Sequence, residues 1–148
     1  MLRRVGLQLP ILACLFVVAG AEEPVSISDL LTDPDVYHLH VVTIQGIVRE
    51  VRELDPYVLP SGTACYGAYT FTLEDDGGST IEISVLGACG PPLLRVPDVA
   101  DGDNVQVQAE IHAPGRTGYS RALGVIPGPG SDQSVVQAIA RSISRVAE

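Results

Sequence analysis

The feature that most limits the fold of this chain is a strict alternation of apolar and polar residues on both sides of one tight turn. Apolar residues occupy every second position of 69–73 and again of 81–85, and Asp75-Asp76-Gly77-Gly78 separates the two runs. Successive side chains of a β-strand point to opposite faces, and Asp and Gly favour hairpin turns. The pattern therefore predicts a β-hairpin with one buried face and one polar face.

Further alternating segments indicate that the hairpin belongs to a larger sheet. Residues 41–52 and 105–112 alternate in the same way, and the second segment follows the turn Asp101-Gly102-Asp103. Residues 54–67 carry two Pro and two Gly, which predicts a loop. We expect 122–126 to form a short last strand, so the sequence predicts a mainly β domain of five strands.

Two helices are expected, one on each side of the strands. Ser26 and Asp29 form a weak capping box for a short helix that Pro34 ends. After Gly128-Pro129-Gly130, apolar residues recur at spacings of 4, 4 and 3, which predicts an amphipathic helix in 131–148. We expect this helix to cover the sheet, and a free partner-binding helix is the alternative.

The first 21 residues have the pattern of a signal peptide. Arg3 and Arg4 precede an apolar run, and Ala19-Gly20-Ala21 supplies a cleavage site, which leaves 22–130 as the globular domain. The apolar run is too short for a bilayer span of about 20 residues. We expect a periplasmic or secreted protein. The alternative is a lipoprotein anchored through Cys14, because residues 11–14 resemble a bacterial lipobox.

Cleavage near Ala21 would leave two cysteines, Cys65 and Cys89. An even pair in an exported domain predicts a disulfide. Closing this loop stabilises the fold by about 3.5 kcal/mol in the chain-entropy model.

The charge argues against broad electrostatic capture of nucleic acid or anionic membranes. The net charge is -9, and the basic residues are nine Arg and no Lys. Hydrophobic residues make up 46% of the chain, which is enough for a buried core.

Several of these segments resemble exported bacterial OB-fold domains. The resemblance is carried by LLTDPDVY at 30–37 before VVTIQGIV at 41–48, by the hairpin at 69–85, and by ADGDNVQV at 100–107. Small periplasmic OB-fold proteins share the signal peptide and the acidic character. The resemblance implies a five-stranded OB-type barrel, with a short N-terminal helix and the C-terminal helix added.

An OB barrel binds ligands on its second and third strands and the flanking loops. We therefore predict a non-catalytic exported module that binds a small ligand or an envelope protein, with the disulfide holding the ends of the hairpin. The alternative ligands are single-stranded nucleic acid, which the charge disfavours, and oligosaccharide. The candidate ligand-binding residues are the polar ones of the hairpin: Thr70, Thr72, Glu74, Glu82 and Ser84.

Enzymatic and metal-dependent functions have weaker support, and we predict no catalytic residue, cofactor or metal site. Residues 99–105 resemble the calcium-binding segment of the thermonuclease family, but Asn104 and Gly115 depart from its pattern. Asp75 and Asp76 are expected at a solvated hairpin tip, with weak calcium binding as the alternative. A metal site would need His38, His40 and His112 to converge.

Overall fold

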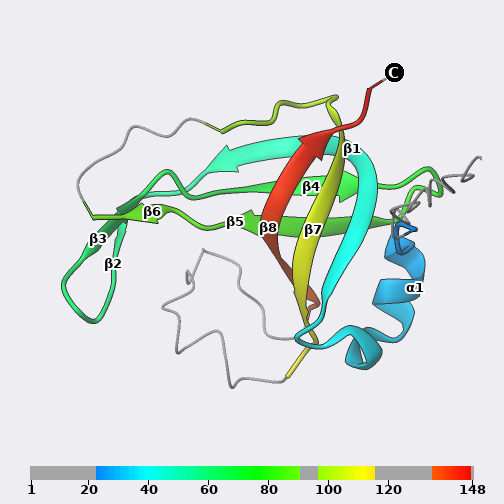
Figure 1. Ribbon diagram of the computed structural model, residues 1–148, viewed down its shortest axis with the longest axis horizontal. Helices are drawn as coiled ribbons and strands as arrows, with labels where there is room; N and C mark the ends of the chain where they lie inside the picture. The colour runs from blue at the N-terminus through cyan, green and yellow to red at the C-terminus, as the bar shows by residue number, and fades with distance from the viewer. Residues whose placement is uncertain (1–22, 91–96, 116–134, 148) are drawn as a thin grey trace, which may run out of the picture.

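A computed structural model describes residues 23–90, 97–115 and 135–147 of the chain (Figure 1). Its elements, in chain order, are α1 (Ile27–Thr32), the 3-10 helix η1 (Pro34–Tyr37), β1 (Val41–Glu53), β2 (Tyr57–Val58), β3 (Ala64–Tyr66), β4 (Tyr69–Glu74), β5 (Thr80–Val85), β6 (Ala88–Cys89), β7 (Asn104–His112) and β8 (Gln137–Arg145).

Five strands form a closed barrel in the order β1-β4-β5-β8-β7, and β7 pairs back to β1. All neighbouring strands are antiparallel except β5 and β8, which are parallel. Taken as strands one to five of the barrel, the order is 1-2-3-5-4, which is the arrangement of an OB-type barrel. The predicted fold class is confirmed in its mainly β character, its five strands and its short N-terminal helix.

Strand β1 serves two neighbours, which is what allows the sheet to close. Its first half, from Val41 to Ile47, pairs with β7, and its second half pairs with β4. The β4 register shifts between Arg49 and Arg52, and Glu50 at this bulge has a φ of 52°. A bulge increases the local bend and twist of a strand, so β1 curves from one neighbour to the other.

The hairpin predicted at 69–85 is confirmed as β4 and β5. The two strands are in register from the pair Tyr69 and Val85 to the pair Glu74 and Thr80. Phe71, Leu73 and Ile83 are buried in the core, as the alternation requires. The intervening side chains therefore point to the outer face of the barrel.

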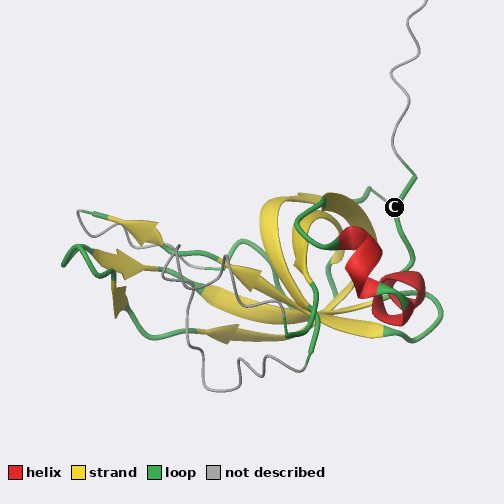
Figure 2. Ribbon diagram, turned by 90° about the horizontal axis from the view of Figure 1, so that it is seen from below, coloured by secondary structure: helices red, strands yellow, loops and turns green. Residues whose placement is uncertain are grey.

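Helix α1 contributes directly to the core. The Ser26 side chain accepts a hydrogen bond from the Asp29 N–H, as the capping pattern predicted. Ile27 and Leu30 are fully buried and belong to the same cluster as the inward residues of the barrel. Figure 2 shows the helical segments packed beside the barrel. Among the residues described, no helix is both long and apolar enough to span a bilayer.

The predicted C-terminal helix is wrong, because 137–145 form β8, the closing strand of the barrel. The register with β7 passes from Gln108–Ser142 to Ala109–Ala140, so Arg141 is an extra residue in β8. Ala138, Ala140 and Ile143 consequently lie opposite core residues of β7. Because of this bulge, the residues of β8 opposite the core are spaced by 2 and then by 3, so they do not show the period of two from which a strand is predicted. The strand expected at 122–126 lies outside the described residues.

The segment predicted as a loop at 54–67 instead contributes to a small second sheet. Its order is β2-β3-β6, and it extends the β4–β5 hairpin beyond the barrel, to the left in Figure 1. We call residues 57–66 with 86–90 the arm. A Cβ on Gly87 would lie 2.6 Å from the Tyr66 carbonyl oxygen, so this close approach requires glycine.

We predict that a chain ending after Val136 loses cooperative folding, because β5 and β7 then lose their common neighbour. A chain ending after Val146 is the control, since it keeps all of β8. Thermal unfolding followed by near-UV circular dichroism checks both chains. A native-like transition in the shorter chain would contradict the role of β8 as a barrel strand.

Candidate functional site

The outer face of β4 and β5 brings the five candidate ligand-binding residues together. Thr72 lies opposite Glu82, and Thr70 lies opposite Ser84. Glu82 is exposed, and Thr72, Glu74 and Ser84 are half-buried. Thr70 is only 8% exposed, so its hydroxyl offers little surface to a ligand.

Two arginines of β1 join this face, and the sequence reasoning missed them. Arg49 lies opposite Thr72, and Arg52 lies opposite Thr70. The Arg49 Nε donates a hydrogen bond of 3.0 Å to Glu74 Oε2. Only the pairing of β1 with β4, which no local pattern specifies, places both cations here. We call Arg49, Arg52, Thr72, Glu82 and Ser84 the ligand face.

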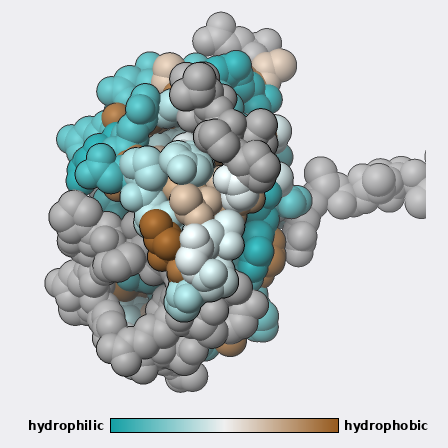
Figure 3. Space-filling view, turned by 90° about the vertical axis from the view of Figure 1, so that its left-hand side faces the viewer, coloured by the Kyte–Doolittle hydropathy of each residue, from teal (hydrophilic) through white to brown (hydrophobic). Residues whose placement is uncertain are grey.

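The arm beside this face is closed by the predicted disulfide. Cys65 and Cys89 are opposite residues of β3 and β6, with an S–S distance of 2.03 Å and a Cα–Cα distance of 4.0 Å. Cys65 is buried and Cys89 is exposed. The disulfide therefore joins the segment before β4 to the segment after β5, at the open end of the hairpin, as expected. Figure 3 views the molecule from this side and shows a mostly hydrophilic or intermediate surface with a small hydrophobic patch.

A cluster of ionisable side chains lies on the outer side of β7 and β8, with Glu110 and His112 buried and Arg141 exposed. Glu110, 8% exposed, accepts a hydrogen bond from the Arg141 guanidinium, and its Oε1 is 3.0 Å from His112 Nε2. Burial alone would raise the pKa of Glu110, but Arg141 and His112 outweigh it and hold the pKa below its ordinary value of 4.5. Arg141 is the bulged residue of β8, so the irregularity supplies the counter-charge.

The three histidines considered as metal ligands do not form one site. The His38 and His112 rings are 6.2 Å apart, and His38 Nδ1 accepts the Ala113 N–H at 3.1 Å. His40 is exposed. In the part of the chain described, no three His, Cys, Asp or Glu side chains are arranged to hold a metal ion.

The acids of the thermonuclease-like segment have structural roles at the turn before β7. Asp101 Oδ1 accepts the Val51 N–H at the bulge of β1. Asp103 Oδ2 accepts the Ala100 N–H and hydrogen bonds from Arg145 of β8. The Ala100 hydrogen bond and the Arg145 guanidinium hold the pKa of Asp103 below its ordinary value. Asp101 and Asp103 therefore link the turn before β7 to β1 and to β8.

No protein-family model matches this sequence, and no curated protein shows significant similarity to it. Solved structures do match. A protein assigned as an aspartyl-tRNA synthetase from Leishmania major Friedlin is 13% identical with a TM-score of 0.52. The match covers 90% of this chain and 22% of that protein. The likeness is one of fold.

A second match is the second OB-fold domain of replication protein A from Methanococcus maripaludis. It is 16% identical with a TM-score of 0.46, and the match covers 75% of this chain and 88% of that one.

We predict that Glu110→Gln destabilises the protein by about 2 kcal/mol at pH 7, because it removes a buried charge from two partners. The folded-state pKa of Glu110 is lowered, so its contribution is complete above pH 4.5 and is lost as the pH falls below that value. Urea unfolding at pH values from about 3 to about 7, the range in which carboxylates titrate, checks this prediction. The control is the exposed Glu82→Gln. An unchanged acid dependence in Glu110→Gln would contradict the assignment.

Proposed function

We propose that the protein is a non-catalytic binding module that holds an oligosaccharide on the ligand face. OB barrels bind oligosaccharides and oligonucleotides on these two strands and the loops beside them. The observation that carries the proposal is the outer surface of β4 and β5 with β1. It combines the hydroxyls of Thr72 and Ser84 with the carboxylate of Glu82 and the guanidinium groups of β1.

The chemistry of this face suits a neutral polar ligand. Hydroxyl, carboxylate and guanidinium groups together donate and accept hydrogen bonds, as a sugar does. The Arg49 charge is compensated by Glu74, and the whole chain has a net charge of -9. Tyr57 and Tyr66 of the arm are half-buried, and a tyrosine ring offers an apolar surface with a polar tip.

Single-stranded nucleic acid is the second candidate. Arg49 and Arg52 on the ligand face favour it, and one structure of similar fold is assigned as an aspartyl-tRNA synthetase. Such sites combine a positive groove with stacking aromatic rings. This candidate is weaker than an oligosaccharide for two reasons. Arg49 already forms an ion pair with Glu74, and the net negative charge of the chain repels phosphate groups.

We further propose that the module is exported after cleavage near Ala21. The disulfide supports this location, because disulfides persist mainly in oxidising compartments. We expect the intact mass of the exported protein to equal that of residues 22–148 less two hydrogens. A mass that includes a lipid on Cys14 would mean a membrane-anchored lipoprotein instead, and retention of the first 21 residues would contradict export by cleavage.

We predict that the double variant Thr72→Val and Ser84→Ala weakens oligosaccharide binding about thirtyfold, because it removes two hydrogen-bonding hydroxyls of about 1 kcal/mol each and keeps a similar shape. A glycan array selects the ligand, and titration calorimetry measures its affinity. The matched control is Ser142→Ala, on β8. We expect reduction of the disulfide to weaken binding as well, because it frees the arm.

Equal affinity of the double variant and the control for the glycan would contradict the assignment of the ligand face as the binding site. A dodecamer of oligo-dT is the competing ligand in the same experiment. Binding of this oligonucleotide with a steep loss on added salt, and no binding to any glycan, would replace the oligosaccharide with single-stranded nucleic acid. Equal binding by the oxidised and reduced protein would show that the arm does not organise the face.

A further inference from the structure

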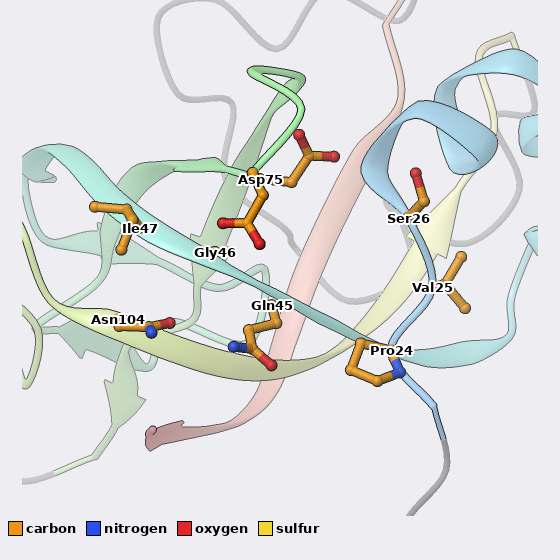
Figure 4. Close-up of a pocket in the computed structure, with 9 residues that line it drawn as sticks. Pro24, Val25, Ser26, Gln45, Gly46, Ile47, Asp75 and Asn104 are labelled. Atoms are coloured by element: carbon orange, nitrogen blue, oxygen red, sulfur yellow. The ribbon is translucent and has the colours of Figure 1, made fainter. Parts of the chain in front are cut away.

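A hollow lies between the segment before α1, the middle of β1, the turn from β4 to β5 and the start of β7 (Figure 4). Its volume is 380 Å³, which is in the range of small-ligand sites. Four segments far apart in the sequence line it, and the backbone hydrogen bond from the Val25 N–H to the Thr43 carbonyl fixes the first of them against β1. Its described lining consists of residues 24–26 and 45–47 with Asp75, Asp76 and Asn104.

Asp75 is held in one position by its own turn. Its Oδ1 accepts the N–H groups of Gly77 at 3.0 Å and Ser79 at 2.9 Å, and its backbone N–H donates to the Ser79 carbonyl. Its other carboxylate oxygen, Oδ2, has no hydrogen-bond partner among the described residues. The turn thus presents a fixed, half-buried carboxylate with one oxygen that accepts no hydrogen bond from the described residues, while Asp76 at the hairpin tip is exposed.

Two amide side chains of the hollow also lack a side-chain partner among the described residues, whereas the Ser26 hydroxyl is engaged in capping α1. No side-chain hydrogen bond joins the Gln45 or Asn104 amide to another described residue, and Figure 4 shows both near the space below Asp75. Asp76 adds a second carboxylate, and it is exposed. The described residues that line the hollow include no cation, so the formal charges that they place on the wall are negative.

The remaining wall is aliphatic. Pro24, Val25 and Ile47 line the hollow beside the polar groups, and Ile47 is half-buried although it lies on the outer side of β1. A ligand that fits all of these groups has a positive hydrogen-bond donor at one end and a methylene chain behind it.

We propose that this hollow binds a primary alkylammonium group. An ammonium ion has three N–H donors and no acceptor. The Asp75 carboxylate and the amide oxygens of Gln45 and Asn104 supply matching acceptors, while the aliphatic wall covers the carbon chain, as it does for long basic side chains elsewhere. The site shares no residue with the ligand face and does not depend on the function proposed for it.

No side chain of this protein can supply the ammonium group. This chain contains no Lys, so the side chains of a second copy cannot supply one. Two sources share the chemistry: a free aliphatic amine and a lysine side chain of a partner protein. The test uses 1,5-diaminopentane for the first, N-acetyl-lysine amide for the second, and N-acetyl-norleucine amide as the uncharged analogue.

The measurement is the change in ¹H–¹⁵N NMR spectra of the protein on titration with each compound. We expect saturable shifts of Gln45, Asp76 and Asn104 with an amine and none with the norleucine compound. Asp75→Asn should weaken binding about fivefold or more, because it removes the charge and keeps an acceptor oxygen for the turn. The control is Asp55→Asn, an exposed acid outside the hollow, which should leave the affinity unchanged.

Saturable binding of either amine supports the site, and binding of the lysine amide alone assigns it to a partner protein. The proposal is wrong if neither amine gives saturable shifts, if the norleucine compound binds equally, or if Asp75→Asn and Asp55→Asn have the same effect. Shifts at these residues with Ca²⁺ and not with an amine would also overturn it. Native amide shifts for 77–85 in Asp75→Asn confirm that the variant keeps its hairpin.

Discussion

The closure of five strands into one barrel is the constraint on which the other features depend. It needs β1 to pair with both β7 and β4, and it needs β8 to lie between β7 and β5. Each requirement is met with a bulge, at Glu50 in β1 and at Arg141 in β8. Closure places the apolar alternate residues inside with Ile27 and Leu30. It also leaves a continuous outer surface for the polar ones.

The parts of the fold that could be predicted are those with local causes. The hairpin follows from its own alternation and turn, and α1 follows from the Ser26 cap and Pro34. The identity of the last strand could not be predicted in this way. The bulge at Arg141 is visible only against the partner strand, and without that partner the spacing of Val135, Ile139 and Ile143 fits a helix.

The candidate site also contains features that the sequence predicts and features that depend on distant contacts. Strand parity was enough to place Thr72, Glu82 and Ser84 on one outer face, and the cysteine count was enough for the disulfide. The contribution of Arg49 and Arg52 depends on the pairing of distant strands. The burial of Thr70 and the hollow around Asp75 depend on how separate segments pack, which the sequence pattern does not encode.

Native-state hydrogen exchange is the most direct test of barrel closure, since it reports the free energy needed to expose each amide. The account predicts that the paired amides of β8, from Ala138 to Ile143, exchange only on global unfolding, together with those of Ile44 in β1 and Val107 in β7. Fast exchange throughout 137–145, with strong protection of β1 and β7, would contradict it, because the barrel would then be stable without its closing strand.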